Sequence, residues 1–233
     1  MDDREEYVHE VIDNESDART CAQLISEEFS AHEPVCMYDH ITPEFFFNEL
    51  ARPFITETLN EGLSFLVRHR STDETIAAIF ANDLYVAHEK YPYNPSGPPA
   101  RFAFLDLLDE MDDIFIHQDF GQELKPGMVL HIMIGATRAQ YTGKGIANRL
   151  RAFMCNYARD VKGFQYAFVQ VSNPATRHIC IKKMGGKEVT IIDPRTWVWK
   201  KNDDGLSRPY KYKDFQGGTV PNILVELKQV KNK

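Results

Sequence analysis

The sequence of 233 residues has little of several features that mark whole classes of protein. No apolar run approaches the roughly 20 residues that a membrane-spanning helix needs. Basic residues are fewer than acidic ones, 27 against 34, so no basic stripe is available to bind nucleic acid. The four cysteines include no Cys-x-x-Cys pair of the metal-binding type. Membrane proteins, nucleic-acid-binding proteins and structural zinc proteins are therefore disfavoured.

Composition otherwise matches an ordinary globular protein, with 43% hydrophobic residues to form a core. Neither a repeat nor a low-complexity linker interrupts the chain, so we expect one domain over residues 1–233. The start, Met-Asp-Asp-Arg-Glu-Glu, is charged and lacks the apolar run of a signal peptide. Scattered cysteines are typical of reduced thiols, so we expect a cytoplasmic protein, either a monomer or a weak dimer. The net charge of −7 suits a cationic substrate.

The most informative segment is residues 140–147, Gln-Tyr-Thr-Gly-Lys-Gly-Ile-Ala. Before it, residues 128–134 are almost continuously apolar, which predicts a strand buried on both faces. After it, apolar residues recur at helical spacing: Leu150, Phe153, Met154, Tyr157 and Ala158. A strand therefore turns through Gly143 and Gly145 into an amphipathic helix. The free N–H groups and positive dipole end of such a helix favour anions, most often phosphate.

The loop differs from two common nucleotide-binding motifs. A dinucleotide fingerprint needs three glycines and an acidic residue after the next strand, but the predicted strand 166–171 is followed by Ser172 and Asn173. A triphosphate loop needs Ser or Thr after its lysine, whereas Gly145 follows Lys144. A glycine turn without a ligand is the remaining alternative. The buried strand and the regular helix favour a phosphate site.

Helices and strands alternate along the rest of the chain. Helices are predicted at 18–29, 43–60, 102–115 and 175–184, and strands at 7–12, 64–69, 75–84, 187–192 and 222–229. Asn14 is expected to cap the first helix, and Pro34 to end it because proline drives the preceding residue towards an extended conformation. Pro53 should kink the second helix. This order of elements predicts an α/β fold.

The spacing Gln140-x-x-Gly143-x-Gly145 resembles motif A of the GNAT acyltransferases. The element order is similar to the GNAT fold across nearly the whole chain, which implies a mixed, mostly antiparallel central sheet with helices on both faces. In that family the loop holds the pyrophosphate of an acyl-coenzyme A, so the resemblance implies acetyl-CoA as co-substrate. It also implies a set of cofactor-binding residues: Ala136, Thr137, Arg138, Gln140, Thr142, Gly143, Lys144, Gly145, Ile146, Ala147 and Asn173.

Two local segments resemble the insect-type arylalkylamine N-acetyltransferases, which act on dopamine, serotonin, octopamine, tyramine and related amines. One is Ile-Ala-Asn-Arg-Leu at 146–150, directly after the loop. The other is Phe29-x-x-x-Glu33-Pro34, the segment in which that family has its catalytic glutamate. The resemblance therefore implies that Glu33 is the general base.

A base at this position is chemically sensible for an amine acceptor. Alkylamines resemble a lysine side chain, with a pKa of about 10, so they arrive as ammonium ions. The nitrogen cannot attack a thioester until its proton leaves, and a carboxylate can accept that proton directly or through a water. Without the motif, a solvated position before Pro34 is the simpler interpretation of Glu33. The motif favours the interpretation of Glu33 as the general base.

The later steps need further groups. In the resembling fold a backbone N–H of the strand before the loop stabilises the oxyanion, which places residues 135–138 beside the acyl chain. Many GNAT enzymes protonate the leaving thiolate with a tyrosine, but Ile181 occupies that position here. The insect enzymes have serines near the start of this helix. Ser172 and Thr176 are the nearest hydroxyls and are candidate catalytic residues, without a firm assignment of the acid.

Other polar residues have simpler interpretations. Cys180 is interpreted as a buried thiol rather than an acyl-enzyme nucleophile. The pair His32-Glu33 lacks the second histidine of a His-Glu-x-x-His motif, so no metal is expected. The acidic residues of the predicted helix 102–115 are interpreted as a solvated face, with steering of cations as the alternative. Several aromatic residues either pack in the core or form a slot for an aryl group: Tyr38, Phe45, Phe46, Phe47, Trp197 and Trp199.

The sequence therefore predicts an acetyl-CoA-dependent N-acetyltransferase that acts on a small primary amine by direct transfer in a ternary complex. An arylalkylamine is the expected acceptor. Alternatives are another acceptor, such as a polyamine, an amino acid or a long-chain amine, and a non-catalytic acyl-CoA-binding module of the same fold.

Overall fold

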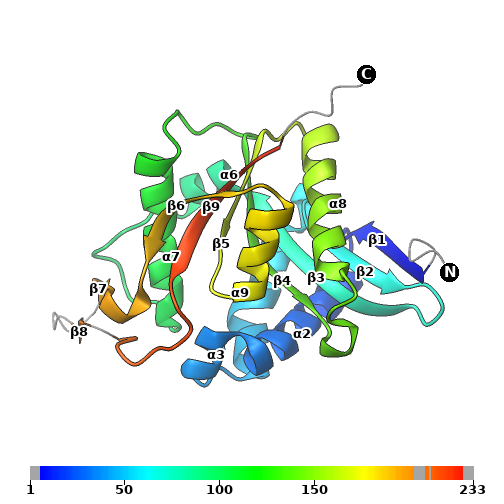
Figure 1. The fold of residues 1–233 in the computed structure, drawn as a ribbon, viewed down its shortest axis with the longest axis horizontal. Coiled ribbons are helices and arrows are strands. Elements are labelled where there is room, and N and C mark those ends of the chain that lie inside the picture. Colours follow the sequence, from blue (N-terminus) through cyan, green and yellow to red (C-terminus); the bar gives the residue numbers. More distant parts are fainter. Residues whose placement is uncertain (1–5, 202–207, 210, 228–233) are drawn as a thin grey trace.

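The computed structural model describes residues 6–201, 208–209 and 211–227. Its central sheet has seven strands in the order β1-β2-β3-β4-β5-β9-β6 (Figure 1). All neighbouring pairs are antiparallel except β4 and β5, which are parallel. The strands of this sheet are β1 (Tyr7–Val11), β2 (Phe65–His69), β3 (Glu74–Asp83), β4 (Val129–Thr137), β5 (Tyr166–Gln170), β6 (Lys187–Ile192) and β9 (Val220–Glu226). The predicted mixed, mostly antiparallel sheet is confirmed.

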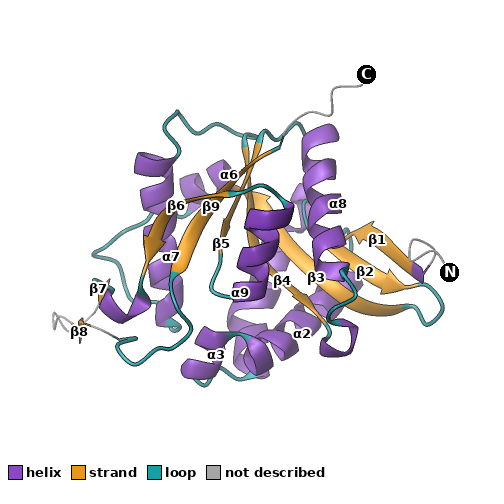
Figure 2. Cartoon of the chain, in the orientation of Figure 1, coloured by secondary structure: helices purple, strands orange, loops and turns teal. Residues whose placement is uncertain are grey.

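Helices cover both faces of the sheet (Figure 2). Helices α8 and α9 lie on one face, and α2 and α7 lie on the other. The helices are α2 (Glu15–His32), α3 (Pro34–Tyr38), α4 (Pro43–Phe46), α5 (Arg52–Thr58), α6 (Leu84–Lys90), α7 (Ala103–Ile114), α8 (Ile146–Asp160) and α9 (Pro174–His178). Short 3-10 or π-helical turns are η1 (Phe47–Ala51), η2 (Leu59–Glu61), η3 (Phe115–Asp119), η4 (Ala139–Tyr141), η5 (Ile179–Lys183) and η6 (Pro194–Thr196), and a small ribbon pairs β7 (Val198–Trp199) with β8 (Arg208–Pro209). No helix of the described part has the length and apolar character to cross a bilayer.

The helix boundaries follow from the capping residues. The Asn14 side chain accepts a hydrogen bond from the backbone N–H of Asp17 at the start of α2, as predicted. Glu33 has an extended backbone, with φ −83° and ψ 122°, and Pro34 begins α3 after it. The helix predicted at 43–60 is interrupted by η1 just before α5, whose first turn contains Pro53. This interruption is the expected effect of proline.

Alternate residues of β3 belong to two different cores. Ile79 packs in the core beneath α8, whereas Phe80 packs in the core with α2, α5 and α7. Since successive side chains of a strand point to opposite faces, the two cores lie on opposite sides of one sheet. The sheet is thus buried on both faces at its centre.

Strands β4 and β5 separate part of the way along their length. Their parallel pairing ends at Ile132 and Val169, while β4 continues to Thr137. The register between β3 and β4 shifts at this point and leaves Met133 as an extra residue, 36% exposed. The expectation of a strand buried on both faces over 128–134 is therefore wrong beyond Ile132. The edge of β4 that faces β5 is open from Met133 onward.

The arm that follows β6 covers the acidic face of α7. Trp199 Nε1 donates a hydrogen bond to Asp106, and Trp197 Nε1 donates to Glu110. Lys200 Nζ lies 2.5 Å from Glu110 Oε1. Asp106 is 2% exposed, so the interpretation as a solvated face is wrong for Asp106 and Glu110, which the arm covers, whereas Asp109 is exposed. Both tryptophans, with their N–H groups bonded to α7, are part of the packing.

Candidate active site

The loop between β4 and α8 has the backbone that a close ligand requires. Gly143 and Gly145 have φ values of 82° and 73°, in the left-handed region that favours glycine. A Cβ atom added to Gly143 would meet no atom within 4 Å. Within the described residues, the N–H groups of 143–145 make no backbone hydrogen bond, and no side chain caps α8. Free N–H groups therefore gather at the positive end of a 15-residue helix.

The carboxylates of Glu27, Glu28 and Glu74 bind residues 138–141, at the start of this loop. Glu28 accepts a hydrogen bond from the backbone N–H of Ala139, and Glu74 accepts from Gln140 and from the Tyr141 hydroxyl. The Arg138 guanidinium lies 3.3 Å from Glu27 and 3.4 Å from Glu74. The side chains of Arg138 and Gln140 are therefore occupied within the protein. Lys144 and Thr142 are exposed, and Lys144 Nζ lies 5.0 Å from the centre of the Tyr141 ring.

The open edge of β4 presents two backbone donors. The Arg138 N–H donates to the Ile76 carbonyl, on the β3 side. Because N–H groups of successive strand residues point to opposite edges, those of Gly135 and Thr137 point away from β3. Beyond Ile132 this edge has no pairing with β5. An extended ligand can therefore pair with β4 where β5 is absent.

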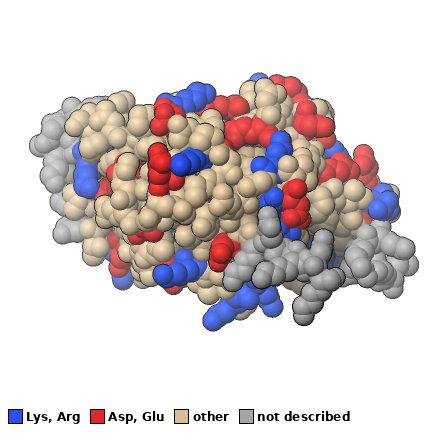
Figure 3. Space-filling model, turned by 90° about the horizontal axis from the view of Figure 1, so that it is seen from above, with Lys and Arg blue, Asp and Glu red and all other residues tan. Residues whose placement is uncertain are grey.

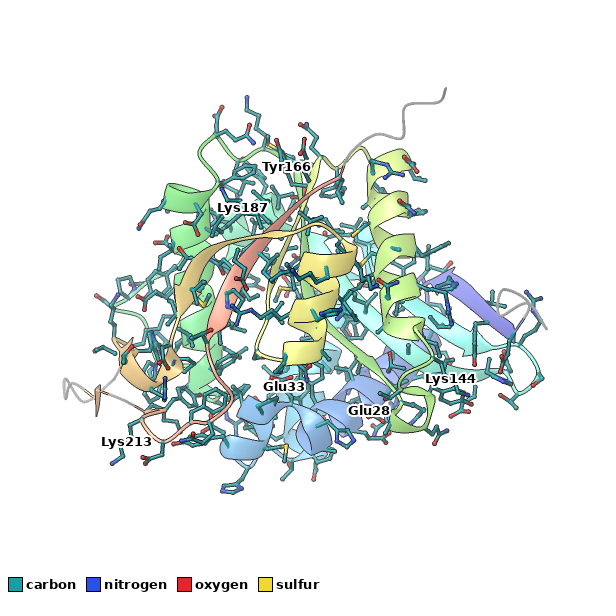
Figure 4. The ribbon with its side chains drawn as sticks, viewed as in Figure 1. Glu28, Glu33, Lys144, Tyr166, Lys187 and Lys213 are labelled. Atoms are coloured by element: carbon teal, nitrogen blue, oxygen red, sulfur yellow. The ribbon has the colours of Figure 1, made fainter. Side chains whose placement is uncertain are left out.

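Glu33 and Ser172, 139 residues apart in sequence, meet at the open end of the separated strands. The Ser172 hydroxyl donates to Glu33 Oε1 at 2.5 Å, and Glu33 is 8% exposed. In Figure 4 Glu33 lies beneath α9, and Glu28 lies between it and Lys144 on the loop. Burial raises the pKa of Glu33, while the Ser172 hydrogen bond acts in the opposite direction. A carboxylate in this setting is a better proton acceptor than an exposed one.

Two further predicted site residues, Asn173 and Thr176, lie at the start of α9. Asn173 Oδ1 accepts hydrogen bonds from the backbone N–H groups of Ala175 and Thr176, so its side chain caps the helix. Thr176 follows Ser172 by four residues and is partly buried. Cys180 is fully buried and burial raises its pKa, which agrees with a structural thiol.

Helix α8 contains one charged side chain, Arg151, whose burial the sequence does not predict. Arg151 is 6% exposed, and its Nη1 donates to the Ala147 carbonyl at 3.4 Å. The sequence places it among the polar positions between apolar ones, where an exposed side chain is the usual outcome.

A cavity of about 170 Å³ lies on the face of the sheet opposite α8. It reaches the sheet at Asn82 of β3 and at His131 and Met133 of β4, and is otherwise lined from α5, η2, α6, the segment after α6, α7 and η3. On the measure by which a water needs about 15 Å³, it holds on the order of ten waters, the size of a small molecule. Sequence reasoning missed this cavity, although a histidine inside the apolar run 128–134 was a signal that something polar lies there.

The molecular surface agrees with the acidic balance of the sequence. Figure 3 shows acidic and basic side chains interspersed, without a continuous basic patch on the face that it presents. That face offers no extended site for a polyanion.

Solved structures share this architecture at low sequence identity. The C-terminal condensation domain of Ebony, in complex with beta-alanyl-dopamine, has a TM-score of 0.74 and 14% identity, over 94% of this chain and 98% of that one. A mosquito arylalkylamine N-acetyltransferase has a TM-score of 0.67 and 13% identity, over 94% and 99%. The Drosophila melanogaster polyamine N-acetyltransferase, which forms N-acetylagmatine, has a TM-score of 0.62 and 16% identity, over 94% and 99%.

No family model and no curated protein sequence matches the chain. The likeness is therefore one of fold, and it confirms the predicted GNAT fold over nearly the whole chain. The chain resembles insect-type enzymes in structure, as the sequence motifs predict.

Proposed function

We propose that this chain, which has the GNAT acetyltransferase fold, is an acetyl-CoA-dependent N-acetyltransferase for a small primary amine. The observation that carries the proposal is Glu33. It is a buried carboxyl with a raised pKa, and it accepts a hydrogen bond from Ser172 at the open end of β4 and β5. Proton removal from an ammonium is the step for which such a group is suited.

The donor would bind along one continuous segment. The N–H groups of residues 143–147 would hold the pyrophosphate, and the exposed side chains of Thr142 and Lys144 lie beside them. The open edge of β4 from Gly135 to Thr137, which includes Ala136, would pair with the pantetheine chain. Arg138 and Gln140 would act by holding the loop in place. Asn173 would act by capping α9 beside the same opening.

This arrangement supports direct transfer in a ternary complex. Glu33 takes a proton from the acceptor ammonium, and the freed nitrogen pair attacks the thioester carbon. The carbonyl oxygen becomes an oxyanion that a β4 backbone N–H stabilises. Its collapse breaks the C–S bond, and the second proton of the attacking nitrogen passes through the hydroxyl of Ser172 or Thr176 to the coenzyme A thiolate, or is lost to solvent while coenzyme A leaves as thiolate. The product is the N-acetyl amine.

The acceptor is proposed as a small primary amine of the arylalkyl type. The mosquito neighbour is named for that class, and the Ebony domain binds beta-alanyl-dopamine. Polyamines and agmatine are the second candidate, because other neighbours are named for them and the cavity is lined by carboxylates. The four cysteines are free, which supports a cytoplasmic location.

Replacement of Glu33 by glutamine tests the proposal. Glu33→Gln keeps the size and removes the base, so kcat should fall on the order of 100- to 10,000-fold while acetyl-CoA still binds. The lost rate should recover in part at high pH, where more of the amine is already neutral. The matched control is Glu44→Gln, an exposed carboxylate in the first turn of α4. Unchanged turnover of every amine by Glu33→Gln would remove the base assignment.

The same assay separates an enzyme from a binding module. The purified chain is given acetyl-CoA with a panel of arylalkylamines, diamines, amino acids and long-chain amines, and thiol release is followed. Binding of acetyl-CoA without release for any amine would favour the non-catalytic module.

A further inference from the structure

Arg151 of α8 is a buried cation that the protein leaves largely unbonded. The residue is 6% exposed, and its Nε makes no hydrogen bond with any described residue. Its Nη1 contacts the Ala147 carbonyl at 3.4 Å, which is longer than an ordinary hydrogen bond. A guanidinium has several N–H donors, and one long contact does not satisfy them. A buried charge in this state is costly unless a ligand or water supplies the missing partner.

The groups around the guanidinium do not balance its charge. Within the described part of the chain, the ionisable groups that act on Arg151 are two thiols, those of Cys155 and Cys180. Burial raises the pKa of Cys155 to about 12 and also raises that of Cys180, so both thiols are protonated at neutral pH. Burial lowers the pKa of Arg151, but a guanidinium keeps its proton at neutral pH. The positive charge therefore has no counter-ion among the described residues.

This charge lies beside the loop proposed to bind phosphate. Side chains of a helix tilt toward its N-terminus, and the contact with Ala147 shows that Arg151 extends back by one turn. Four residues of α8 span about 6 Å along the helix axis. Ala147 belongs to the segment whose N–H groups are proposed to hold the pyrophosphate. The guanidinium approaches that segment from the protein interior, on the side of Cys180 and η5.

An internal cation adds what the exposed part of the loop lacks. Lys144 is exposed, so water and salt screen its attraction to a phosphate. Arg138 is already paired with Glu27 and Glu74. Attraction through the protein interior is screened much less than attraction through solvent. The charge of Arg151 is therefore available to phosphates at the start of α8 and acts on them at high strength.

We propose that Arg151 is the internal counter-charge of the bound pyrophosphate and makes the chain selective for an acyl donor that has phosphates. The inference rests on the proposed acetyltransferase function and adds a buried charge to the backbone donors of the loop. The protein without cofactor holds this charge unpaired, and the cofactor pairs it on binding. Loss of the charge should therefore weaken the cofactor without weakening the fold, because apolar replacement of buried charged groups is often neutral or stabilising.

Replacement of Arg151 by methionine tests both halves of this statement. Arg151→Met keeps an unbranched side chain and removes the charge. The Kd for coenzyme A, measured by calorimetric titration, should rise about tenfold. The melting temperature without ligand should stay equal or rise. Unchanged affinity would overturn the inference, and so would a loss of affinity with a lower melting temperature, which indicates a structural role alone.

A pair of acyl donors shows whether the phosphates are what Arg151 recognises. S-Acetylpantetheine has the thioester and the pantetheine chain of acetyl-CoA but no phosphate. In Arg151→Met, kcat/KM for acetyl-CoA should fall about tenfold through KM rather than kcat, and kcat/KM for S-acetylpantetheine should not change. Equal losses with the two donors would overturn the inference.

Two further variants locate the charge in the interior. Arg159→Met makes the same substitution in the last turn of α8, where Arg159 pairs with Asp160 at 2.7 Å, and should leave coenzyme A affinity unchanged. Lys144→Met should weaken coenzyme A mainly at low salt, whereas the effect of Arg151→Met should persist from about 0.05 M to about 0.5 M salt. An Arg151→Met effect that disappears at high salt would overturn the action through the interior.

A simpler ligand separates this inference from the proposed function. If the wild-type chain does not bind coenzyme A, the proposed function fails, and inorganic pyrophosphate then tests Arg151 by itself. Pyrophosphate should raise the melting temperature of the wild type more than that of Arg151→Met. Equal shifts in the two chains would overturn the role of Arg151. If coenzyme A binds equally well to both chains, the inference fails and the proposed function stands.

Discussion

The two faces of the sheet at the separation of β4 and β5, one covered by α8 and the other by α7, differ in which groups form their sites. On the α8 side, the features proposed to bind phosphate lie in one continuous segment, and the proposed hydrogen-bond donors are the backbone N–H groups of residues 143–147. On the α7 side, the cavity is assembled from side chains of several elements between Phe54 and Met133. The first side depends on backbone conformation, whereas the second depends on the identity of individual side chains.

This difference explains how one fold accommodates many acceptors. Any sequence that turns through two glycines into a helix presents the same backbone N–H groups to the phosphates of an acyl donor. Side chains that line a cavity can be exchanged without loss of the fold, as long as their volume and hydrogen bonds are replaced. Structures that share this architecture at 13 to 16% identity are accordingly named for dopamine conjugates, arylalkylamines and agmatine.

The largest effect is expected from a change of backbone on the α8 side. Gly143→Val places a side chain in the left-handed region and over the free N–H groups, so affinity for coenzyme A should fall on the order of 10- to 100-fold. Gly163→Val is the matched control, because Gly163 has a φ of 83° and nothing within 4 Å of an added Cβ, but lies beyond the far end of α8. Calorimetric titration with coenzyme A measures the difference.

Both glycine variants should lose similar stability, since both impose the same backbone strain. Equal loss of coenzyme A affinity in the two would mean that the effect is global. Unchanged affinity in Gly143→Val would contradict the phosphate-loop assignment.

The α8 side could be predicted from the sequence because its parts are neighbours in the chain. The glycine turn and the start of α8 are local consequences of dihedral preferences and hydrophobic spacing. The pairing of Glu33 with Ser172 could not be derived from spacing, because the fold brings these residues together. The resemblance named each of them as a candidate catalytic residue, but not their contact.

The α7 side could not be predicted in the same way. The acidic pattern of residues 106–113 has the spacing of an exposed helix face, and nothing in that pattern shows that Trp199 covers Asp106. The pairing of Asn82 with His131 depends on the register of β3 and β4 and on its shift near Met133. A shift of this kind depends on tertiary structure, so the hydrophobic pattern of 128–134 does not predict where the burial of β4 ends.

A smaller effect is expected at the boundary between the two sides. Ser172→Ala removes the hydrogen bond that holds the pKa of Glu33 down, so that pKa should rise further. The acid limb of the pH profile of kcat/KM should then move to higher pH, by up to about tenfold in rate on that limb. The limb is measured from pH 5 to 9, with Thr176→Val as the second hydroxyl variant.

The shape of the Ser172→Ala profile distinguishes two roles. A shifted limb with an unchanged plateau means that Ser172 tunes the base. A plateau that falls at every pH, without a shift, would mean that Ser172 instead protonates the leaving thiolate.

The smallest effect concerns the stability cost of a buried base. Burial raises the folded-state pKa of Glu33 above the ordinary value of 4.5, so the folded state favours the protonated form. The preference of the folded state for protonated Glu33 contributes fully to stability below pH 4.5. This contribution is lost as the pH rises through the raised folded-state pKa of Glu33. Glu33→Gln mimics the protonated form at every pH. It should therefore match the wild type near pH 4 and gain relative stability towards neutral pH.

Urea unfolding from pH 4 to pH 8 measures this difference, with the exposed Glu44→Gln as the control whose difference stays constant. Capping does not confuse the result, because the Glu33 side chain makes no capping hydrogen bond to α3. A variant less stable than the wild type at neutral pH would show that the fold stabilises the Glu33 carboxylate. In that case Glu33 would be an anion that stabilises the α2–α3 junction, and its proposed role as a base with a raised pKa would be lost.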